Sequence, residues 1–238
     1  MHNHHGKLLP LAIIAILFMS IFVIAEPQGP IITYNATEYG PIQPAALVNT
    51  SGGTFTTLVL NVSYQNQRWK AYAGNVTGRL TLQDGDGFSI YDWGLTTVGG
   101  QVYASRNDSV DWSAIGCAPS TIINSEQALL NHSALAADNI NNTFSQVGHR
   151  EFFVGTTPIT QSSCPSIATY VNSTAQVIDE NALFQQVLLS DNNALVYTTL
   201  LEDGEEGFNL RRYDFQMIVA ESAISPTPTA YYFWVELS

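Results

Sequence analysis

The stretch "ALVYTTLLEDGEEGFNLRRYDFQMIVA", residues 194–220, consists of two apolar runs separated by a short acidic segment with two glycines. A similar pattern occurs earlier, as "TLQDGDGFSIYDW" at residues 81–93. Asp-Gly between two apolar runs is a strong signal for a β-hairpin, because both central residues of a type I′ turn need a positive φ. Both stretches therefore predict antiparallel strands joined by acidic turns.

The carboxylates of these turns could also bind a cation. Calcium takes roughly six to eight oxygen ligands, and neither turn supplies a full set alone. The candidate ligands are Asp84 and Asp86 in the first turn and Asp203 and Glu205 in the second. We expect plain turns and no cofactor, and a calcium ion shared with neighbouring carboxylates is the alternative.

Short apolar runs with a period of two recur along the chain. In "GTFTTLVLNVSY", residues 53–64, Leu58, Leu60 and Val62 fall on one face, as in a half-buried strand. Further runs of this kind are "RWKAYAG", "VTGRLTLQ", "GQVYASR", "REFFVGT" and "TAYYFWVEL". This spacing predicts a mainly β fold, an antiparallel β-sandwich that is Ig-like or jelly-roll-like.

The last run, "YYFWVEL" at residues 231–237, carries large apolar side chains on both faces. We expect it to be a central strand or a strand covered on both faces. At an exposed edge, a strand of this composition invites aggregation.

The segment between the two cysteines differs from the rest and predicts a short helical insertion at about 124–145. Asn124 or Ser125 could cap its first turn. One helix face would carry Leu129, Ala136, Ile140 and Phe144.

The N-terminal region has the layout of a secretory signal. An apolar run extends from Leu8 to Ala25, and small residues stand at the −3 and −1 positions of a cleavage after Ala25. We expect residues 1–25 to be a signal peptide, with an uncleaved membrane anchor as the alternative. Residues 26–50, rich in Pro, Asn and Thr, are predicted to form an extended arm. A single domain over 51–238 follows.

Cys117 and Cys164 are the only cysteines. In an exported chain an even pair predicts one disulfide, and we expect an extracellular or cell-surface location. The formal net charge of −12 at pH 7 repels phosphate backbones and argues against nucleic acid as a partner.

Asn-x-Ser/Thr sequons are more frequent than the roughly three that this composition would give by chance. Eight occur, which favours an N-glycosylated surface protein. The acceptors are Asn35, Asn49, Asn61, Asn75, Asn107, Asn131, Asn141 and Asn172.

Motifs for catalysis are missing from the sequence. It contains no H-x-x-x-H pair, no G-x-S-x-G elbow and no glycine-rich phosphate loop. Asp92 and Asp214 could form a glycosidase pair, but we expect strand-end carboxylates neutralised by Arg211 or Arg212. No enzymatic activity is therefore expected.

Aromatic side chains suggest a second kind of site. Trp69 and Trp93 could form a carbohydrate platform, although aromatic residues of a β-sandwich more often pack in the core.

Four stretches together resemble an uncharacterised family of secreted cell-surface β-proteins from uncultivated archaea. They are "RWKAYAGNVTG", "DWSAIGCA", "YDFQMIV" and "YYFWVEL". The resemblance implies a cell-surface origin and carries over no catalytic residue.

These observations predict a structural protein, a subunit of an extracellular filament, sheath or envelope layer. Strand addition would join copies of the chain, using the extended arm or the run at 230–237. The alternative is a carbohydrate-binding or adhesion module that binds glycans. A membrane would be contacted only through the N-terminal segment, if it stays uncleaved.

Overall fold

A six-stranded sheet organises the part of the chain that the structure, a computed structural model, describes: residues 26–33 and 35–238. The predicted signal peptide lies outside the described residues. The strand order is β14–β4–β10–β9–β5, with β8 also paired to β9, and all these pairings are antiparallel. The bounds are β4 Gly100–Ser105, β5 Gly116–Cys117, β8 Ser166–Ala168, β9 Gln185–Ser190, β10 Leu195–Leu200 and β14 Tyr232–Leu237.

The central hairpin of this sheet, β9–β10, is buried at all of its strand positions. Its turn begins at Asp191, whose carboxylate accepts hydrogen bonds from the main-chain N–H of Asn193 (2.9 Å) and Ala194 (2.7 Å). Asn192 adopts a positive φ of 72°, a conformation that Asn tolerates better than most residues. The sequence did not indicate β9, because "QQVLLS" lacks a period of two.

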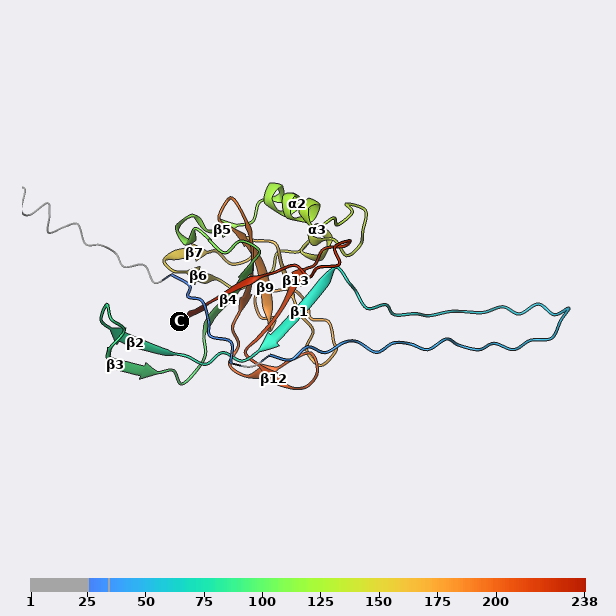
Figure 1. Cartoon of the computed structure of the whole chain (residues 1–238), viewed down its shortest axis with the longest axis horizontal. Coiled ribbons are helices and arrows are strands. Elements are labelled where there is room, and N and C mark those ends of the chain that lie inside the picture. Colours follow the sequence, from blue (N-terminus) through green and yellow to red (C-terminus); the bar gives the residue numbers. More distant parts are fainter. Residues whose placement is uncertain (1–25, 34) are drawn as a thin grey trace, which may run out of the picture.

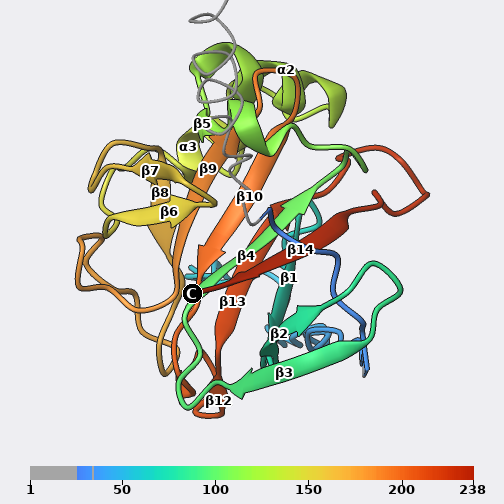
Figure 2. The same cartoon turned by 90° about the vertical axis from the view of Figure 1, so that its left-hand side faces the viewer.

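One face of the sheet is covered by a second, two-stranded sheet and by two helices (Figure 2). Met217, Val219, Ile140 and Phe144 from this cover pack against Tyr197 and its neighbours in one core cluster. The covering elements are β1 Trp69–Gly74, β13 Phe215–Ala220, α2 Ser120–Leu129 and α3 Ile140–Thr143.

The opposite face is covered by a short hairpin and a 3₁₀ turn. Tyr103, Trp112 and Trp234 meet there with ring centroids 5.0 and 5.6 Å apart, within a second core cluster. The elements are β6 Phe152–Val154, β7 Thr157–Ile159 and η1 Trp112–Ala114. Two small hairpins complete the fold: β2 Arg79–Gln83 with β3 Ser89–Gly94, and β11 Glu205–Glu206 with β12 Arg212–Tyr213.

The prediction of a mainly β fold is confirmed: several antiparallel sheets with a short helical insertion, consistent with a β-sandwich. Residues 194–220, however, do not form one long hairpin. β10 pairs with β4 and β9, whereas β13 pairs with β1. Only the small β11–β12 hairpin forms between them, because β13 crosses over to the covering layer.

The predicted disulfide is present between Cys117 and Cys164. The helical insertion is present too, but its details differ from the prediction. α2 begins at Ser120, after Pro119, so neither Asn124 nor Ser125 is its cap. Ile123 and Leu130 are buried in this segment, whereas Leu129 is 66% exposed; Ile140 and Phe144 are buried as predicted.

The prediction of a strand over 53–64 is wrong for the single chain. Residues 54–66 have no assigned secondary structure. They belong to a loop, residues 35–67, that runs out from the body and back in two extended branches (Figure 1). Alternation showed that the segment suits a strand, but it carried no information on whether a partner exists in the same chain.

Within the described ranges, no helix has the length and apolarity needed to cross a membrane.

Candidate functional site

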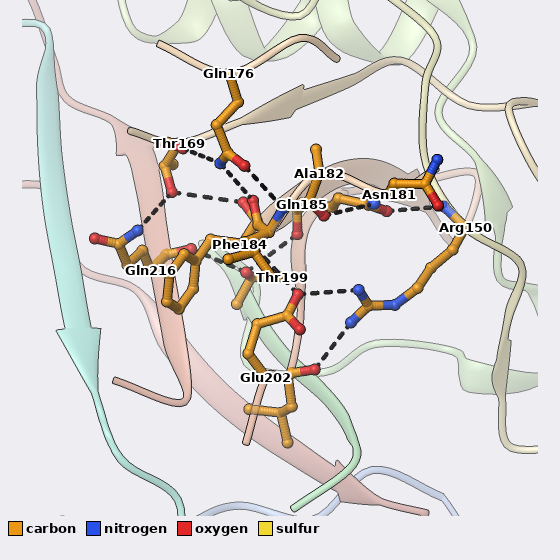
Figure 3. Close-up of polar contacts among 12 residues, drawn as sticks. Arg150, Thr169, Gln176, Asn181, Ala182, Phe184, Gln185, Thr199, Glu202 and Gln216 are labelled. Atoms are coloured by element: carbon orange, nitrogen blue, oxygen red, sulfur yellow. Dashed lines mark hydrogen bonds and ion pairs between the residues drawn. The ribbon is translucent and has the colours of Figure 1, made fainter. Parts of the chain in front are cut away.

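A network of buried and half-buried polar groups lies where β9 meets its neighbours (Figure 3). Gln185, Gln176 and Gln216 each bind main-chain groups of adjacent loops; Gln176 Nε2, for example, donates to Thr169 O (2.6 Å) and Leu183 O (2.8 Å). An ion pair between Arg150 and Glu202 (2.9 Å) closes the network. These groups are engaged with the main chain, so the network positions loops.

The two histidines of the described chain are also bound to the main chain. His149 Nε2 accepts hydrogen bonds from the N–H of Ser163 (3.1 Å) and Cys164 (3.0 Å), while Nδ1 contacts Arg150 O (2.9 Å). Burial lowers the pKa of His149, and the bond to Arg150 offsets this in part. His132 Nε2 contacts Glu221 O (2.7 Å). Neither ring presents a free basic nitrogen to solvent.

Glu221 is held ionised and is therefore unsuited to act as a general acid. Burial raises its pKa, but hydrogen bonds from Lys70, Thr229 and nearby main-chain N–H groups outweigh burial and lower the pKa to about 2. The Lys70 Nζ atom lies 2.8 Å from the carboxylate. The pair joins β1 to the loop that precedes β14 and has a structural role.

The first acidic turn is built by Asp84. Its carboxylate accepts hydrogen bonds from the N–H of Asp86 (3.0 Å) and Phe88 (2.8 Å), and Gly87 has a φ of 87°. The expected type I′ geometry is wrong, because Asp84 and Gly85 do not have positive φ. The hairpin itself, β2–β3, is present as predicted.

The second acidic turn leads into the β11–β12 hairpin. Asp203 is exposed, and Glu205 pairs with Tyr213 in the ladder. Within residues 26–33 and 35–238, no three His, Cys, Asp or Glu side chains are gathered in a way that could hold a metal ion. The calcium alternative therefore stays a prediction, and the described residues contain no preformed site for the ion.

Asp92 and Asp214 serve different structural purposes. Asp92 pairs with Arg79 on the exposed face of the β2–β3 hairpin (2.8 Å). Asp214 is buried and accepts hydrogen bonds from the main-chain N–H of Val76 (2.7 Å) and Gly204 (2.9 Å). The expectation that Arg211 or Arg212 would pair with them is wrong, because main-chain donors and Arg79 are closer.

The two candidate platform tryptophans have different surroundings. Trp69 packs against Phe144 and His132, and its indole N–H donates to Asp138 O (2.7 Å), so this ring belongs to the core edge and is not a platform. Trp93 is 50% exposed and meets Tyr91 edge-on at 4.9 Å. Only Trp93 keeps a surface that a sugar ring could contact.

Seven of the eight sequon asparagines are exposed. The exception is Asn141 in α3, which is half-buried and whose Nδ2, the atom that would carry the glycan, donates to Asn124 (2.7 Å) and Gln127 (3.1 Å). Three of the exposed asparagines, Asn35, Asn49 and Asn61, lie on the projecting loop. Glycosylation at these positions stays a prediction.

The projecting loop, which we call the arm and define as residues 35–67, is the most unusual surface of the chain. Apart from half-buried Gly40, every one of its residues is exposed. Large apolar side chains are nevertheless frequent, and Val59 is 97% exposed. Contiguous exposed apolar surface marks an interaction site in a soluble protein. The sequence predicted an arm at 26–50. In the structure Gln28 is instead bridged to β14, and the projecting loop continues past residue 50 through the "GTFTTLVLNVSY" segment.

A second unusual feature is the outer edge of β14. The sequence predicted a central strand or one covered on both faces; the first alternative is wrong, because β14 is an edge strand of the six-stranded sheet. Its outer side carries a single bridge, in which Val235 exchanges two main-chain hydrogen bonds with Gln28 (3.0 and 2.8 Å). Nothing in the sequence indicated this contact. Its two faces are partly covered: Phe233, Val235 and Leu237 pack against one core cluster and Trp234 against the other, and no position of β14 is fully buried.

Together the arm and the β14 edge provide main-chain donors and acceptors, with apolar side chains beside them. Two surface hollows, one beside loop 221–228 and one beside Pro27, contain no acid–base pair of the kind a catalyst needs. The arrangement is suited to protein–protein pairing.

Comparison with protein-family models, with curated proteins and with solved structures finds no match to this chain. The resemblance to archaeal secreted β-proteins therefore stays a prediction.

Proposed function

We propose that this chain is an exported, N-glycosylated structural protein of the cell surface, which assembles by strand addition into a filament, sheath or envelope layer. Its partners are copies of itself, and the proposal includes no enzymatic activity. The disulfide supports an extracellular location, because disulfides persist in oxidising compartments.

The arm is the observation that carries this proposal. A loop of this length without secondary structure is uncommon in a domain and is usually functional or a linker. Both ends of the arm return to the body, so a linker role between domains does not fit. In its returning branch Leu58, Leu60 and Val62 fall on one face, and apart from Val59 the residues between and beside them are polar. An added strand needs one such apolar face to bury on a neighbour.

Excision of the arm provides a direct test. Gly40 lies against the side chain of Gln65, so residues 41–64 can be removed and Gly40 joined to Gln65 with little strain. We expect the melting temperature to change by less than about 2 °C, because the arm adds no buried surface. Ordered polymers seen by light scattering and negative-stain imaging should disappear. Polymers of unchanged order in the excised protein would contradict the proposal.

A matched pair of substitutions separates strand addition from general stickiness. The triple variant Leu58→Ser, Leu60→Ser, Val62→Ser removes the alternating face and should abolish assembly. The control Ile42→Ser, Leu47→Ser, Phe55→Ser removes exposed apolar surface outside that face and should leave assembly intact. Equal loss in both would indicate unspecific aggregation.

The second candidate function is a carbohydrate-binding or adhesion module. The Tyr91–Trp93 pair favours it, since it lies half-exposed on a hairpin that packs on neither core cluster. Trp93→Ala would then reduce retention on immobilised polysaccharide while leaving polymers unchanged. Trp69→Ala is not an equivalent control, because that ring stabilises the core edge.

A further inference from the structure

We propose that the arm of one copy pairs with the outer edge of β14 in a second copy, as an antiparallel strand formed by residues 57–64. This inference rests on the proposed function and names the acceptor for it. The strand would take the place of the short segment 26–30, which we call the strap.

The β14 edge has unused main-chain groups. Val235 directs both its N–H and its C=O outward, to Gln28. Residues of an antiparallel strand alternate in this respect, so Phe233 and Leu237 also direct theirs outward. These two have no backbone or side-chain partner on that side within the described residues. The edge can therefore accept a longer strand than it now holds.

Apart from the strap, the edge lacks the features that usually protect one. Residues 232–237 contain no proline and no lysine, and the side chain of Glu236 is bound inward, to Tyr103 Oη (2.7 Å) and Gly155 N (2.8 Å). Natural edge strands are commonly blunted by charges, prolines or bulges. Within the described residues only the strap covers this edge, at the single bridge to Val235, so most of the edge remains open to pairing with another strand.

The strap is a weak occupant of this edge. Pro27 and Pro30 flank Gln28 and have no N–H, so the strap pairs at one position only. Pro27 is buried beside Trp112 and Val154 and holds the strap in place. If the strap leaves the edge, its two main-chain hydrogen bonds are lost. A strand formed by residues 57–64 of an arm can replace them with a larger number.

The arm is the segment of the described chain that best matches this edge. Residues 57–64 contain no proline, are exposed, and have no main-chain partner of their own. Six residues of β14 extend about 20 Å, which a donor of eight residues covers. In the single chain the arm runs away from the body (Figure 1), so a second copy is the acceptor we infer.

Side-chain pattern fixes a register. Phe233, Val235 and Leu237 face the core cluster that contains β13. Pairing Leu60 with Val235 places Leu58 and Val62 beside Leu237 and Phe233 and extends this apolar row. Asn61 then points to the other face of the sheet, near the rim, where a glycan has access to solvent.

In this register Ser63 lies directly opposite Tyr232, as a pair without mutual hydrogen bonds. Such pairs have Cα atoms about 4.5 Å apart, which allows a disulfide. The described chain has no free cysteine, so introduced thiols report cleanly. One protein carries Ser63→Cys and the other Tyr232→Cys, both prepared without glycans because Ser63 belongs to the Asn61 sequon.

Mixing the two single-cysteine proteins under mild oxidation should give a cross-linked heterodimer. The control Tyr64→Cys, which faces the opposite side of the arm, should cross-link at least tenfold more slowly. A variant with Gln28→Pro in the acceptor should cross-link about fivefold faster, because the strap loses one main-chain hydrogen bond.

Other outcomes overturn the inference in distinguishable ways. If excision of 41–64 still abolishes polymers but Tyr232→Cys captures no arm, the acceptor lies elsewhere and the proposed function stands. If Leu80→Cys on the β2–β3 hairpin captures the arm instead, that hairpin is the acceptor. Cross-linking within one chain of a dilute Ser63→Cys/Tyr232→Cys double variant, without heterodimers in the mixture, would show intramolecular pairing.

Discussion

Gln186, in the middle of the central sheet, shows how single buried polar residues are used in this protein. Its amide donates to Ile218 O (2.6 Å) and accepts from Ile218 N (2.9 Å), and so reproduces the pairing that a neighbouring strand would offer. This contact fixes β13 on the face of the sheet. Buried polar groups need such partners, because an unpaired one costs about 1–3 kcal/mol.

His149 leads to a prediction about pH. The folded protein holds its ring neutral, because Nε2 accepts two hydrogen bonds that a protonated ring could not accept. The unfolded chain binds a proton below a pH of about 6.5, whereas the folded chain, with its lowered pKa, does not. Stability should therefore fall as pH falls below 6.5, by at most about 1.4 kcal/mol per pH unit.

Denaturant unfolding at pH 7.5, 6.5 and 5.5 measures this dependence. His149→Gln keeps an acceptor but does not titrate, so its stability should change less over the same range. Parallel slopes for the two proteins would show that His149 is not responsible.

At the scale of elements, the β2–β3 hairpin contrasts with the β9–β10 hairpin. β9–β10 is buried on both faces, while most positions of β2 and all positions of β3 are exposed. An isolated two-stranded hairpin is marginally stable in water. The turn must therefore contribute much of its stability, and Asp84 provides two of the hydrogen bonds there.

Asp84→Ala should weaken the hairpin without affecting the rest of the fold. Loss of the two side-chain bonds, roughly 1–2 kcal/mol together, should speed hydrogen exchange of the β2–β3 amides by about five- to thirtyfold. Asp86→Ala, whose carboxylate makes no described contact, is the control and should exchange like the wild type. Protection that rises with calcium and is lost in EDTA would instead favour the cation alternative.

At the scale of the whole molecule, the disulfide closes a segment that contains both helices and the β6–β7 hairpin. Cys117 lies in β5, and Cys164 precedes β8; both strands pair with β9. The bridge therefore joins two neighbours of one central strand. In the unfolded chain it restricts a loop of 47 residues, which lowers the entropy of that state.

The double variant Cys117→Ser/Cys164→Ala should lose about 4 kcal/mol of unfolding free energy if the chain-entropy model holds. Ala at 164 avoids burying a hydroxyl at a site with no exposed surface. Thermal unfolding of the variant and of reduced wild type should agree. Polymers should still form well below the melting temperature, since arm and edge lie outside the closed loop; their loss there would show that the loop shapes the assembly surface.

The sequence predicted most of the elements, because the signals for a strand or a turn are local. The strands at 69–74, 79–83, 89–94 and 100–105 lie where the apolar runs indicated. Errors occurred where the signal was absent or ambiguous. β9 has two buried glutamines and no alternation, and α2 starts four residues before the predicted cap.

For the candidate site, the sequence identified the arm and the terminal strand, but it did not show whether each has a hydrogen-bonded partner. It indicated an arm and an apolar terminal strand, yet placed 53–64 in a sheet, and for 231–237 it predicted either a central strand or a strand covered on both faces. From the sequence, Trp69 and Trp93 were equal candidates for a carbohydrate platform, and only their packing in the structure distinguished them. Nothing in the sequence predicted the bridge of Gln28 to β14, because a bridge between two single residues produces no periodic pattern of side chains.

What the sequence determined by itself is the mainly β class, the disulfide partners and the alternation that makes 53–64 suited to a strand. Only the tertiary structure decided which strands are neighbours, which one forms an edge and which segment is left without a partner. The physical reason is that alternation and turn residues act over a few positions, whereas a strand's hydrogen-bond partner comes from a distant part of the chain. An unpaired strand and an unprotected edge become visible only when all the pairings are known.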